Sequence, residues 1–318
     1  MIRKTHFINK YDYGKDVVDL DEYVVSLGTN CSLGCEYCYL KFSKTPQQPV
    51  IYENFEKFTE EIKELFNATK KDIFYFNLGE TTDSFLTKQH FETLEKLIEI
   101  INTTAKEHKK FCFVELRTKT ANIKKFAKRL FFENVKLIYA ATFSPQQLIE
   151  KFEKGTANLK ERLNSLSFAQ QLNFLVGIRL EPIILYPVLG ISYKDILEST
   201  ENLVNEYKSL IKLTLNEINH KNLHSIALST LRLTKKQFKL LTKQKSQLCF
   251  FETFLCPDGK IRYSRPIRIN IYKQLIDFIK NLYPELVEKT LLSFEFEYIW
   301  RNCNLKIKTL PQLSSNYL

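Results

Sequence analysis

Short runs of β-branched and aromatic residues alternate along the chain with longer stretches in which apolar residues recur every three or four positions. The short runs predict buried strands, and the longer stretches predict amphipathic helices. The predicted strands cover residues 23–27, 73–77, 111–116, 136–141, 174–184 and 225–228. The predicted helices cover residues 53–67, 87–102, 121–132, 146–171 and 193–210. This alternation is typical of β-α-β units and therefore predicts a parallel sheet.

Six such units favour an α/β fold built as a partial (β/α)6 barrel, with functional groups at the carboxyl ends of the strands. The pattern changes after about residue 235 to a helix, a stretch rich in cysteine and aromatic residues at 249–263, and helices at 271–282 and 284–292. We therefore predict a barrel over residues 1–234. Residues 235–318 would form a C-terminal helical and hairpin extension packed on that barrel.

The composition is that of a globular enzyme, because 44% of the 318 residues are hydrophobic and can fill a sizeable core. No apolar run reaches eighteen residues, and the basic start of the chain is not followed by an apolar signal region. These features predict a soluble cytoplasmic protein that does not associate with a membrane.

The net charge of +11 favours a polyanionic partner such as a nucleic acid. Lysine is abundant throughout the chain, however, so a general coding bias explains the excess equally well. The seven cysteines include three within eight positions, which is a poor layout for a secreted disulfide framework. Metal binding in a reducing compartment explains this spacing better.

The three crowded cysteines are Cys31, Cys35 and Cys38, in a segment that follows the first predicted strand. Three thiolates on a short loop can bind three irons of a 4Fe-4S cluster and leave the fourth iron open to a small molecule. Gly34 would let the loop turn tightly. The alternatives are a zinc site or three unrelated thiols, although zinc usually needs four ligands and no fourth is evident nearby.

The cysteine spacing, the aromatic Tyr37 before the last cysteine and the position after a first strand resemble the radical S-adenosylmethionine superfamily. This resemblance implies that the open iron binds S-adenosylmethionine and that one-electron reduction releases a 5′-deoxyadenosyl radical. The electron would come from a donor such as flavodoxin or ferredoxin. The resemblance further implies that Tyr37 packs near the adenine.

Gly79 and Glu80 end the second predicted strand and resemble the Gly-Gly-Glu element of that superfamily, with Leu78 in place of one glycine. The Glu80 carboxylate can accept hydrogen bonds from the methionyl ammonium group. Other polar residues lie at or near the ends of later strands, where cations, hydroxyls and carboxylates could bind the methionyl carboxylate and the ribose. They include Lys119, Thr142, Ser144, Arg179 and Glu181. Each of these residues, taken singly, could equally be an ordinary loop or capping residue.

Further motifs resemble the spore photoproduct lyase family, radical enzymes that reverse a thymine dimer in spore DNA. The matching segments are residues 31–40 (CSLGCEYCYL), Thr118-Lys119, residues 149–156 (IEKFEKGT), Arg162, Pro182-Ile183 and residues 229–232 (STLR). The resemblance covers about two thirds of the chain. It implies a DNA substrate, contacts from Lys119 and Ser144 to S-adenosylmethionine, and a role for Tyr39 in returning a hydrogen atom to the substrate.

The chain departs from that family at Glu80, because authentic lyases place a hydrogen-donating cysteine three residues before the aspartate that matches Asp83. Tyr39 or one of the residues Cys112, Cys249 and Cys256 could take over that task. Tyr39 and Glu80 are therefore our candidate catalytic residues. A radical enzyme that modifies a peptide or small molecule is an alternative function, and a non-catalytic metal-binding protein is another.

The segment 256–265 carries several cations and a Pro-Asp-Gly sequence. It could form a hairpin that binds a nucleic-acid backbone, or it could be a plain surface turn.

Overall fold

A computed structural model describes residues 1–42, 48–126, 130–186 and 193–318. Its main element is an eight-stranded sheet in the order β1-β2-β5-β6-β7-β8-β9-β13. The strands are β1 (Ile8–Lys10), β2 (Tyr23–Val25), β5 (Ile73–Asn77), β6 (Phe111–Thr118), β7 (Val135–Thr142), β8 (Leu175–Ile183), β9 (Leu223–Thr230) and β13 (Thr290–Leu292). Neighbouring strands from β2 to β13 are parallel, whereas β1 pairs with β2 in the antiparallel direction.

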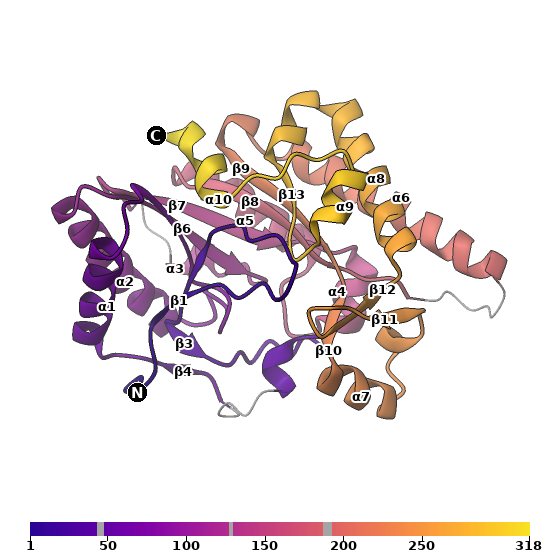
Figure 1. The fold of residues 1–318 in the computed structure, drawn as a ribbon, viewed down its shortest axis with the longest axis horizontal. Coiled ribbons are helices and arrows are strands. Elements are labelled where there is room, and N and C mark those ends of the chain that lie inside the picture. The colour runs from indigo at the N-terminus through magenta and orange to yellow at the C-terminus, as the bar shows by residue number, and fades with distance from the viewer. Residues whose placement is uncertain (43–47, 127–129, 187–192) are drawn as a thin grey trace.

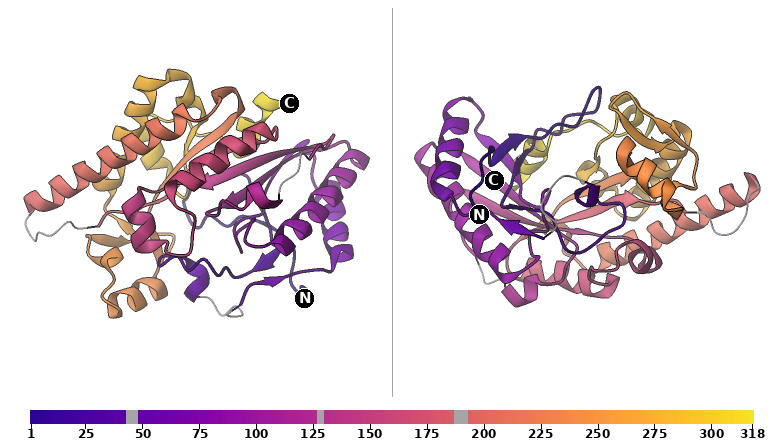
Figure 2. Two further views of the ribbon diagram at one scale, coloured as in Figure 1. Left: turned by 180° about the vertical axis from the view of Figure 1, so that it is seen from behind. Right: turned by 90° about the horizontal axis from the view of Figure 1, so that it is seen from below.

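Helices cover the outer face of this sheet, which curls into an open half-barrel (Figures 1 and 2). They are α1 (Phe55–Asn67), α2 (Lys88–Glu107), α3 (Ile123–Phe126), α4 (Gln146–Phe152), α5 (Leu159–Gln171) and α6 (Tyr193–Asn216). Strand β9 is buried along its whole length, as expected for a parallel strand that is covered on both faces. The predicted α/β partial barrel is therefore confirmed.

The chain after β9 forms a hairpin unit and a set of helices beside the barrel. The hairpin unit is a three-stranded sheet in the order β10-β12-β11, made by β10 (Arg232–Thr234), β11 (Thr253–Leu255) and β12 (Lys260–Tyr263). Between β10 and β11 lie α7 (Lys235–Lys243) and the 3-10 turn η3 (Gln247–Cys249). The remaining elements are α8 (Arg265–Leu282), η4 (Pro284–Lys289), α9 (Glu297–Asn302), α10 (Leu310–Ser314) and η5 (Ser315–Tyr317).

Three predicted helices differ from the structure. The helix at 146–171 is two helices, because Asn158 and Glu161 form a capping box that starts α5 after an irregular segment at 153–158. The helix at 284–292 is the short turn η4 followed by β13, because residues 290–292 pair with β9. Within the predicted helix at 121–132, only α3 is helical among the described residues, and residues 127–129 lie outside them.

Smaller elements connect the barrel strands. The pair β3 (Gly28–Thr29) and β4 (Val50–Ile51) flanks the cysteine segment, the 3-10 turn η1 (Tyr39–Phe42) follows it, and η2 (His220–Asn222) precedes β9. In the part of the chain that the structure describes, every helix is too short or too polar to cross a bilayer.

Candidate active site

A cavity of about 580 Å³ lies at the carboxyl ends of the barrel strands. Ten of the residues predicted from the sequence line it: Cys31, Cys35, Tyr37, Cys38, Tyr39, Gly79, Glu80, Lys119, Thr142 and Glu181. They come from the segment after β3 and from the ends of β5, β6, β7 and β8. The common edge of the parallel sheet brings together residues that are up to 150 positions apart in the sequence.

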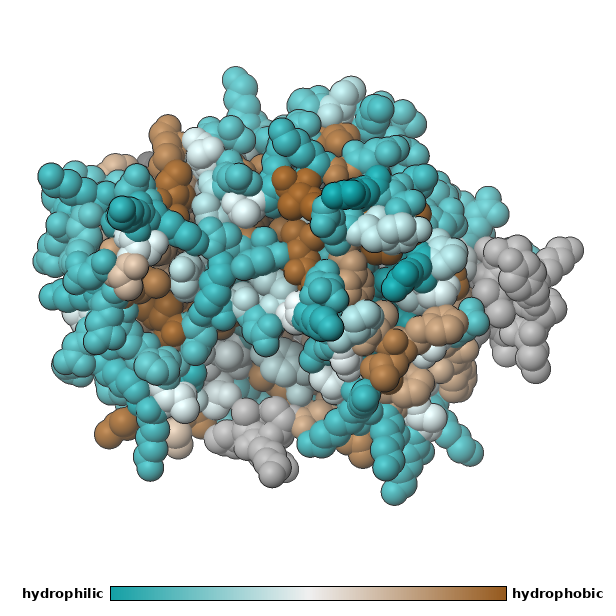
Figure 3. Space-filling model, in the orientation of Figure 1, coloured by the Kyte–Doolittle hydropathy of each residue, from teal (hydrophilic) through white to brown (hydrophobic). Residues whose placement is uncertain are grey.

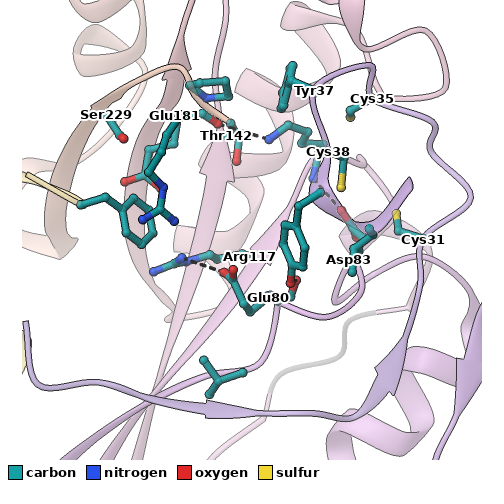
Figure 4. A pocket seen from close by; sticks show the side chains of 18 of the residues that line it. Cys31, Cys35, Tyr37, Cys38, Glu80, Asp83, Arg117, Thr142, Glu181 and Ser229 are labelled. Carbon is teal, nitrogen blue, oxygen red and sulfur yellow. Dashed lines mark hydrogen bonds and ion pairs between the residues drawn. The ribbon is translucent and has the colours of Figure 1, made fainter. Parts of the chain in front are cut away.

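The three cysteines lie together on one side of the cavity, opposite Glu181 and Ser229 (Figure 4). Gly34, at a φ of 73°, makes the turn between Cys31 and Cys35. Burial raises the pKa of Cys31 and of Cys35 to about 12, so both thiols are protonated at neutral pH unless a cation stabilises the thiolates.

No three His, Cys, Asp or Glu side chains among the described residues are grouped closely enough to hold one metal ion. A 4Fe-4S cluster spreads three thiolates over three irons and does not require the spacing of a single-ion site.

An irregular segment between α4 and α5 supports the cysteine loop from one side. Gly155 packs directly on the loop, since a Cβ atom there would lie 2.3 Å from the carbonyl oxygen of Leu33. The Tyr37 hydroxyl donates a hydrogen bond to the buried Glu153, which also forms an ion pair of 2.6 Å with Arg162. Burial opposes ionisation of Glu153, but the charges of Arg162 and Lys119 hold its pKa below the usual value.

Helix α7 supports the loop from the other side. The Gln237 side chain donates a 3.0 Å hydrogen bond to the Tyr37 carbonyl oxygen, and Lys236 Nζ donates one of 2.6 Å to the carbonyl oxygen of Phe42. Ser246, just after the helix, donates a hydrogen bond to the Glu36 carboxylate. The cysteine loop is thus held between two segments that are more than 100 residues away along the chain.

Glu80 lies at the centre of a polar group on the cavity wall. Its carboxylate is 3.5 Å from the Arg117 guanidinium and accepts a 3.1 Å hydrogen bond from the Tyr11 hydroxyl. The Tyr39 hydroxyl donates a 2.9 Å hydrogen bond to the Glu80 carbonyl oxygen. Gly79 is required beside it, since a Cβ atom there would lie 2.4 Å from the Arg117 Cβ atom.

Arg117 also contacts two carboxylates deeper in the barrel. Its Nε atom is 2.6 Å from Glu115 and its Nη2 atom is 3.2 Å from Glu22. Burial alone would raise the pKa of Glu115, but the charges of Arg117 and Arg179 hold it well below its usual value. Burial raises the pKa of Glu22 to about 7, because the charge of Arg117 and the hydrogen bond from Tyr13 offset only part of that effect and the charge of Glu115 adds to it.

Lys119, Thr142 and Glu181 lie on the opposite wall. The Lys119 ammonium is 5.8 Å from the centre of the Tyr37 ring and 3.5 Å from the Glu181 carbonyl oxygen. The Lys119 backbone N–H donates a 2.8 Å hydrogen bond to the buried Asp83. The Oε1 atom of Glu181 is buried and has no hydrogen-bond partner in the described part of the chain.

Two predicted residues, Ser144 and Arg179, do not line the cavity. Ser144 is buried behind Thr142, and its hydroxyl is 3.4 Å from the Glu153 carboxylate. Arg179 is buried below Glu181, where it donates hydrogen bonds to Glu115 and to the Ser225 hydroxyl. Both positions allow an indirect role, in which these side chains orient the residues that face the cavity.

Several residues that shape the site are not among the site residues predicted from the sequence. Asp83 accepts two hydrogen bonds from the end of β6, from the Thr118 hydroxyl and the Lys119 backbone N–H, and Arg117 contacts three carboxylates. Arg232, Lys260 and Phe294 bring the C-terminal part of the chain to the cavity. Arg117 belongs to the Arg-Thr-Lys sequence at a strand end, from which a cation for the site was expected. No local pattern marks the contact of Arg232 with the Phe294 ring, whose centre is 3.9 Å away.

Of the cysteines considered as substitutes for the missing hydrogen donor, Cys112 is fully buried in β6. Neither Cys249 nor Cys256 is among the residues lining the cavity. Tyr39 does line it and is 40% exposed.

A sequence model of spore photoproduct lyase matches residues 2–292. This chain belongs to the spore photoproduct lyase family. The resemblance inferred from the cysteine segment and the later motifs is therefore confirmed. No curated protein sequence gave a match.

Solved structures of the family share the fold. A spore photoproduct lyase complexed with dinucleoside spore photoproduct is 17% identical, with a TM-score of 0.72 over 92% of this chain and 80% of that one. A substituted spore photoproduct lyase with bound AdoMet and dinucleoside spore photoproduct is 17% identical, with a TM-score of 0.68 over the same shares.

Proposed function

We propose that this member of the spore photoproduct lyase family is a radical S-adenosylmethionine enzyme. Cys31, Cys35 and Cys38 would hold a 4Fe-4S cluster, and the cavity beside them would hold S-adenosylmethionine. The bound pair supplies, on one-electron reduction, a 5′-deoxyadenosyl radical that abstracts a hydrogen atom from the substrate. This proposal rests on one observation, namely that the three cysteines and the polar residues at the strand ends line the same cavity.

The residues present fit S-adenosylmethionine. Glu80 provides a carboxylate for the methionyl ammonium group, and Lys119 provides a cation for the methionyl carboxylate. The unpartnered Oε1 atom of Glu181 needs a hydrogen-bond donor, which the ribose hydroxyls could supply. Tyr37, fixed by Glu153, presents its ring beside Lys119 and could pack against the adenine.

The substrate we propose is a thymine photoproduct in DNA, as in the dinucleoside complex of the solved relative. Arg232 and Lys260 reach the cavity from the hairpin unit and offer cations to a phosphate group. The net charge of +11 agrees with a polyanionic substrate. Tyr39 lies between the cysteine loop and Glu80, where its hydroxyl could take part in returning a hydrogen atom to the product.

The test is anaerobic reconstitution with iron and sulfide, followed by incubation with S-adenosylmethionine, dithionite and dinucleoside spore photoproduct. We expect 5′-deoxyadenosine and thymidine to form, and both to be lost in the Cys38→Ala variant. The Cys256→Ala variant is the matched control and should retain both products. Zinc without iron in protein purified without oxygen would contradict the proposal and support a non-catalytic metal-binding protein.

The second candidate is a radical enzyme that modifies a peptide or small molecule. It is favoured by one observation, namely that Glu80 stands at the cavity wall where the family resemblance places a hydrogen-donating cysteine. Formation of 5′-deoxyadenosine without any repair of the photoproduct, in DNA as well as in the dinucleoside, would select this candidate over the lyase.

A further inference from the structure

Helix α7 carries an exposed row of lysines on the face that points away from the barrel. Lys235, Lys239 and Lys243 follow one another at four-residue spacing, and Lys245 lies just beyond the helix; all four are exposed. We refer to these four residues as the lysine face. No Asp or Glu occurs between Glu217 and Glu252 in the sequence. The buried face of the helix is formed by Gln237 and Leu241.

The lysine face is not neutralised by the rest of the protein. No described acidic residue forms an ion pair with any of its four lysines, whereas Lys57, Lys88, Lys106 and Lys110 each pair with a carboxylate. Like charges at four-residue spacing destabilise a helix, so folding alone gives no reason for this arrangement.

Apolar side chains are also exposed on α7 and in the hairpin unit that packs against it. Leu240 of α7 is 36% exposed, and Phe250, which follows η3, is 57% exposed. Phe254 and Leu255 of strand β11, in the same hairpin unit, are 50% and 55% exposed. Figure 3 shows an apolar area over the hairpin unit, with hydrophilic side chains projecting below it from the region of α7. Apolar residues surrounded by charge are typical of a protein–protein interface.

The same helix is bonded directly to the cysteine loop. Gln237 and Lys236 donate hydrogen bonds of 3.0 Å and 2.6 Å to carbonyl oxygens of Tyr37 and Phe42, on either side of Cys38. A protein that binds the outer face of α7 is therefore separated from the cysteine loop by little more than one helix.

We propose that the lysine face, with Leu240 and Phe250, is the docking surface for a one-electron carrier protein with an acidic surface. This inference rests on the proposed function, which requires one electron from outside for each cleavage of S-adenosylmethionine. The carrier is oxidised by one electron and the bound cluster is reduced by one, with no bond formed between the two proteins. Electrostatic complementarity accelerates such encounters, which use small and short-lived interfaces.

A nucleic acid is the other polyanion that could bind lysines. The substrate must enter the cavity, however, and the cations that line the cavity are Lys10, Arg117, Lys119, Arg232 and Lys260, none of which belongs to the lysine face. The exposed Leu240 and Phe250 also favour a protein, because a phosphate backbone offers them no apolar partner.

The test compares two triple variants of the full chain with the same change in net charge. Lys235→Glu, Lys239→Glu and Lys243→Glu remove the docking charges. Lys63→Glu, Lys273→Glu and Lys280→Glu change exposed lysines on α1 and α8 and serve as the control. Binding of oxidised flavodoxin and of a 2Fe-2S ferredoxin is measured with cluster-free protein at low and high salt. Formation of 5′-deoxyadenosine is measured with reconstituted protein, with either the reduced carrier or dithionite as electron source.

We expect the docking variant to bind at least one of the two carriers about tenfold or more weakly at low salt, and its binding of that carrier to depend much less on salt. It should form 5′-deoxyadenosine more slowly with that reduced carrier but at the original rate with dithionite. The control variant should behave as the original protein does. Unchanged carrier binding would overturn the proposal, and so would a matching loss of affinity for a single-stranded oligonucleotide, which would assign the lysine face to DNA. Failure of the original protein to form 5′-deoxyadenosine with dithionite would instead contradict the proposed function, while carrier binding still tests the docking surface.

Discussion

Two buried carboxylates that share Arg117 differ in their protonation. Glu115 is held ionised by two cations, Arg117 and Arg179, whereas Glu22 is buried with Arg117 as its one ion-pair partner and has its pKa raised to about 7. Glu22 accepts a 2.6 Å hydrogen bond from Tyr13, which fixes its position. One guanidinium cannot fully stabilise the three carboxylates around it, so Glu22, which is fully buried and repelled by Glu115 and Glu80, titrates near neutrality.

The raised pKa of Glu22 predicts a pH dependence of stability. Because the folded chain binds this proton more tightly than the unfolded chain, the stabilisation is fully present below about pH 4.5 and is lost as the pH rises through about 7. Between about pH 5 and pH 8, we expect the free energy of unfolding of the original protein to fall by up to about 3 kcal/mol more than that of the Glu22→Gln variant. Urea denaturation of cluster-free protein measures this difference. Parallel pH profiles for the two proteins would contradict it.

Glu181 gives a prediction about cofactor binding. Replacing its carboxylate by an amide in Glu181→Gln keeps the shape but removes the charge that strengthens a hydrogen bond from a ribose hydroxyl. We expect the dissociation constant for S-adenosylmethionine to rise about tenfold to a hundredfold, with the iron content unchanged. Calorimetric titration of reconstituted protein measures this change, and Glu150→Gln on the exposed face of α4 is the control. Equal affinities in the two variants would remove Glu181 from the proposed ribose site.

At the scale of elements, the cysteine loop has little regular structure of its own and depends on its neighbours. The segment after α4 contacts it through Gly155, and α7 contacts it through Gln237 and Lys236. These contacts hold the loop against the ends of the barrel strands without long secondary structure within the loop. A substitution in either of these two segments should therefore displace the cysteines more than it displaces the barrel strands.

Gly155→Ala tests this dependence. The added methyl group would lie 2.3 Å from the Leu33 carbonyl oxygen, so the loop or the segment after α4 must move. We expect a loss of about 1–3 kcal/mol in the free energy of unfolding and a clear fall in iron and sulfide per chain after reconstitution. Gly259→Ala is the control, because φ is 74° there but nothing lies within 4 Å of the added atom. It should lose a similar amount of stability at unchanged iron content.

At the scale of the whole molecule, the C-terminal part of the chain completes the barrel. Strand β13 pairs with β9 and covers what would otherwise be an open sheet edge. Arg232, Lys260 and Phe294 from the same part of the chain close one side of the cavity. We propose that residues 1–234 form the barrel and residues 235–318 its extension, and that the two parts fold as one cooperative unit.

Truncation tests that proposal. A chain of residues 1–234 would expose the β9 edge and lose the packing of Trp300 and of the apolar face of α8, all of which are buried. We expect it to be insoluble or to unfold without cooperativity in circular dichroism. Co-expression with residues 235–318 as a separate chain should restore a soluble complex. A truncated chain that unfolds in a sharp transition by itself would show that the two parts are independent domains.

Local sequence determined much of this protein. Short, continuous apolar runs located the six central strands, because a parallel strand that is covered on both faces must be apolar on both faces. The C-x3-C-x2-C spacing located the cysteine loop, because the residues that share a cluster must be close on one short segment. The Gly-Glu pair and the polar strand ends were found because strand direction alone decides which edge they reach.

Only the tertiary structure decided how these pieces are held. Residues 290–292 form a strand because they pair with the free edge of β9. The apolar pattern of that segment, which predicted a helix, contains no information about this distant edge. Arg179 forms an ion pair with Glu115 and does not line the cavity. Its charge is buried, and a buried charge is strongly destabilising unless a group of opposite charge lies beside it. The supports of the cysteine loop, Gly155 and Gln237, depend on contacts between residues more than a hundred positions apart, and such contacts leave no local pattern in a single sequence.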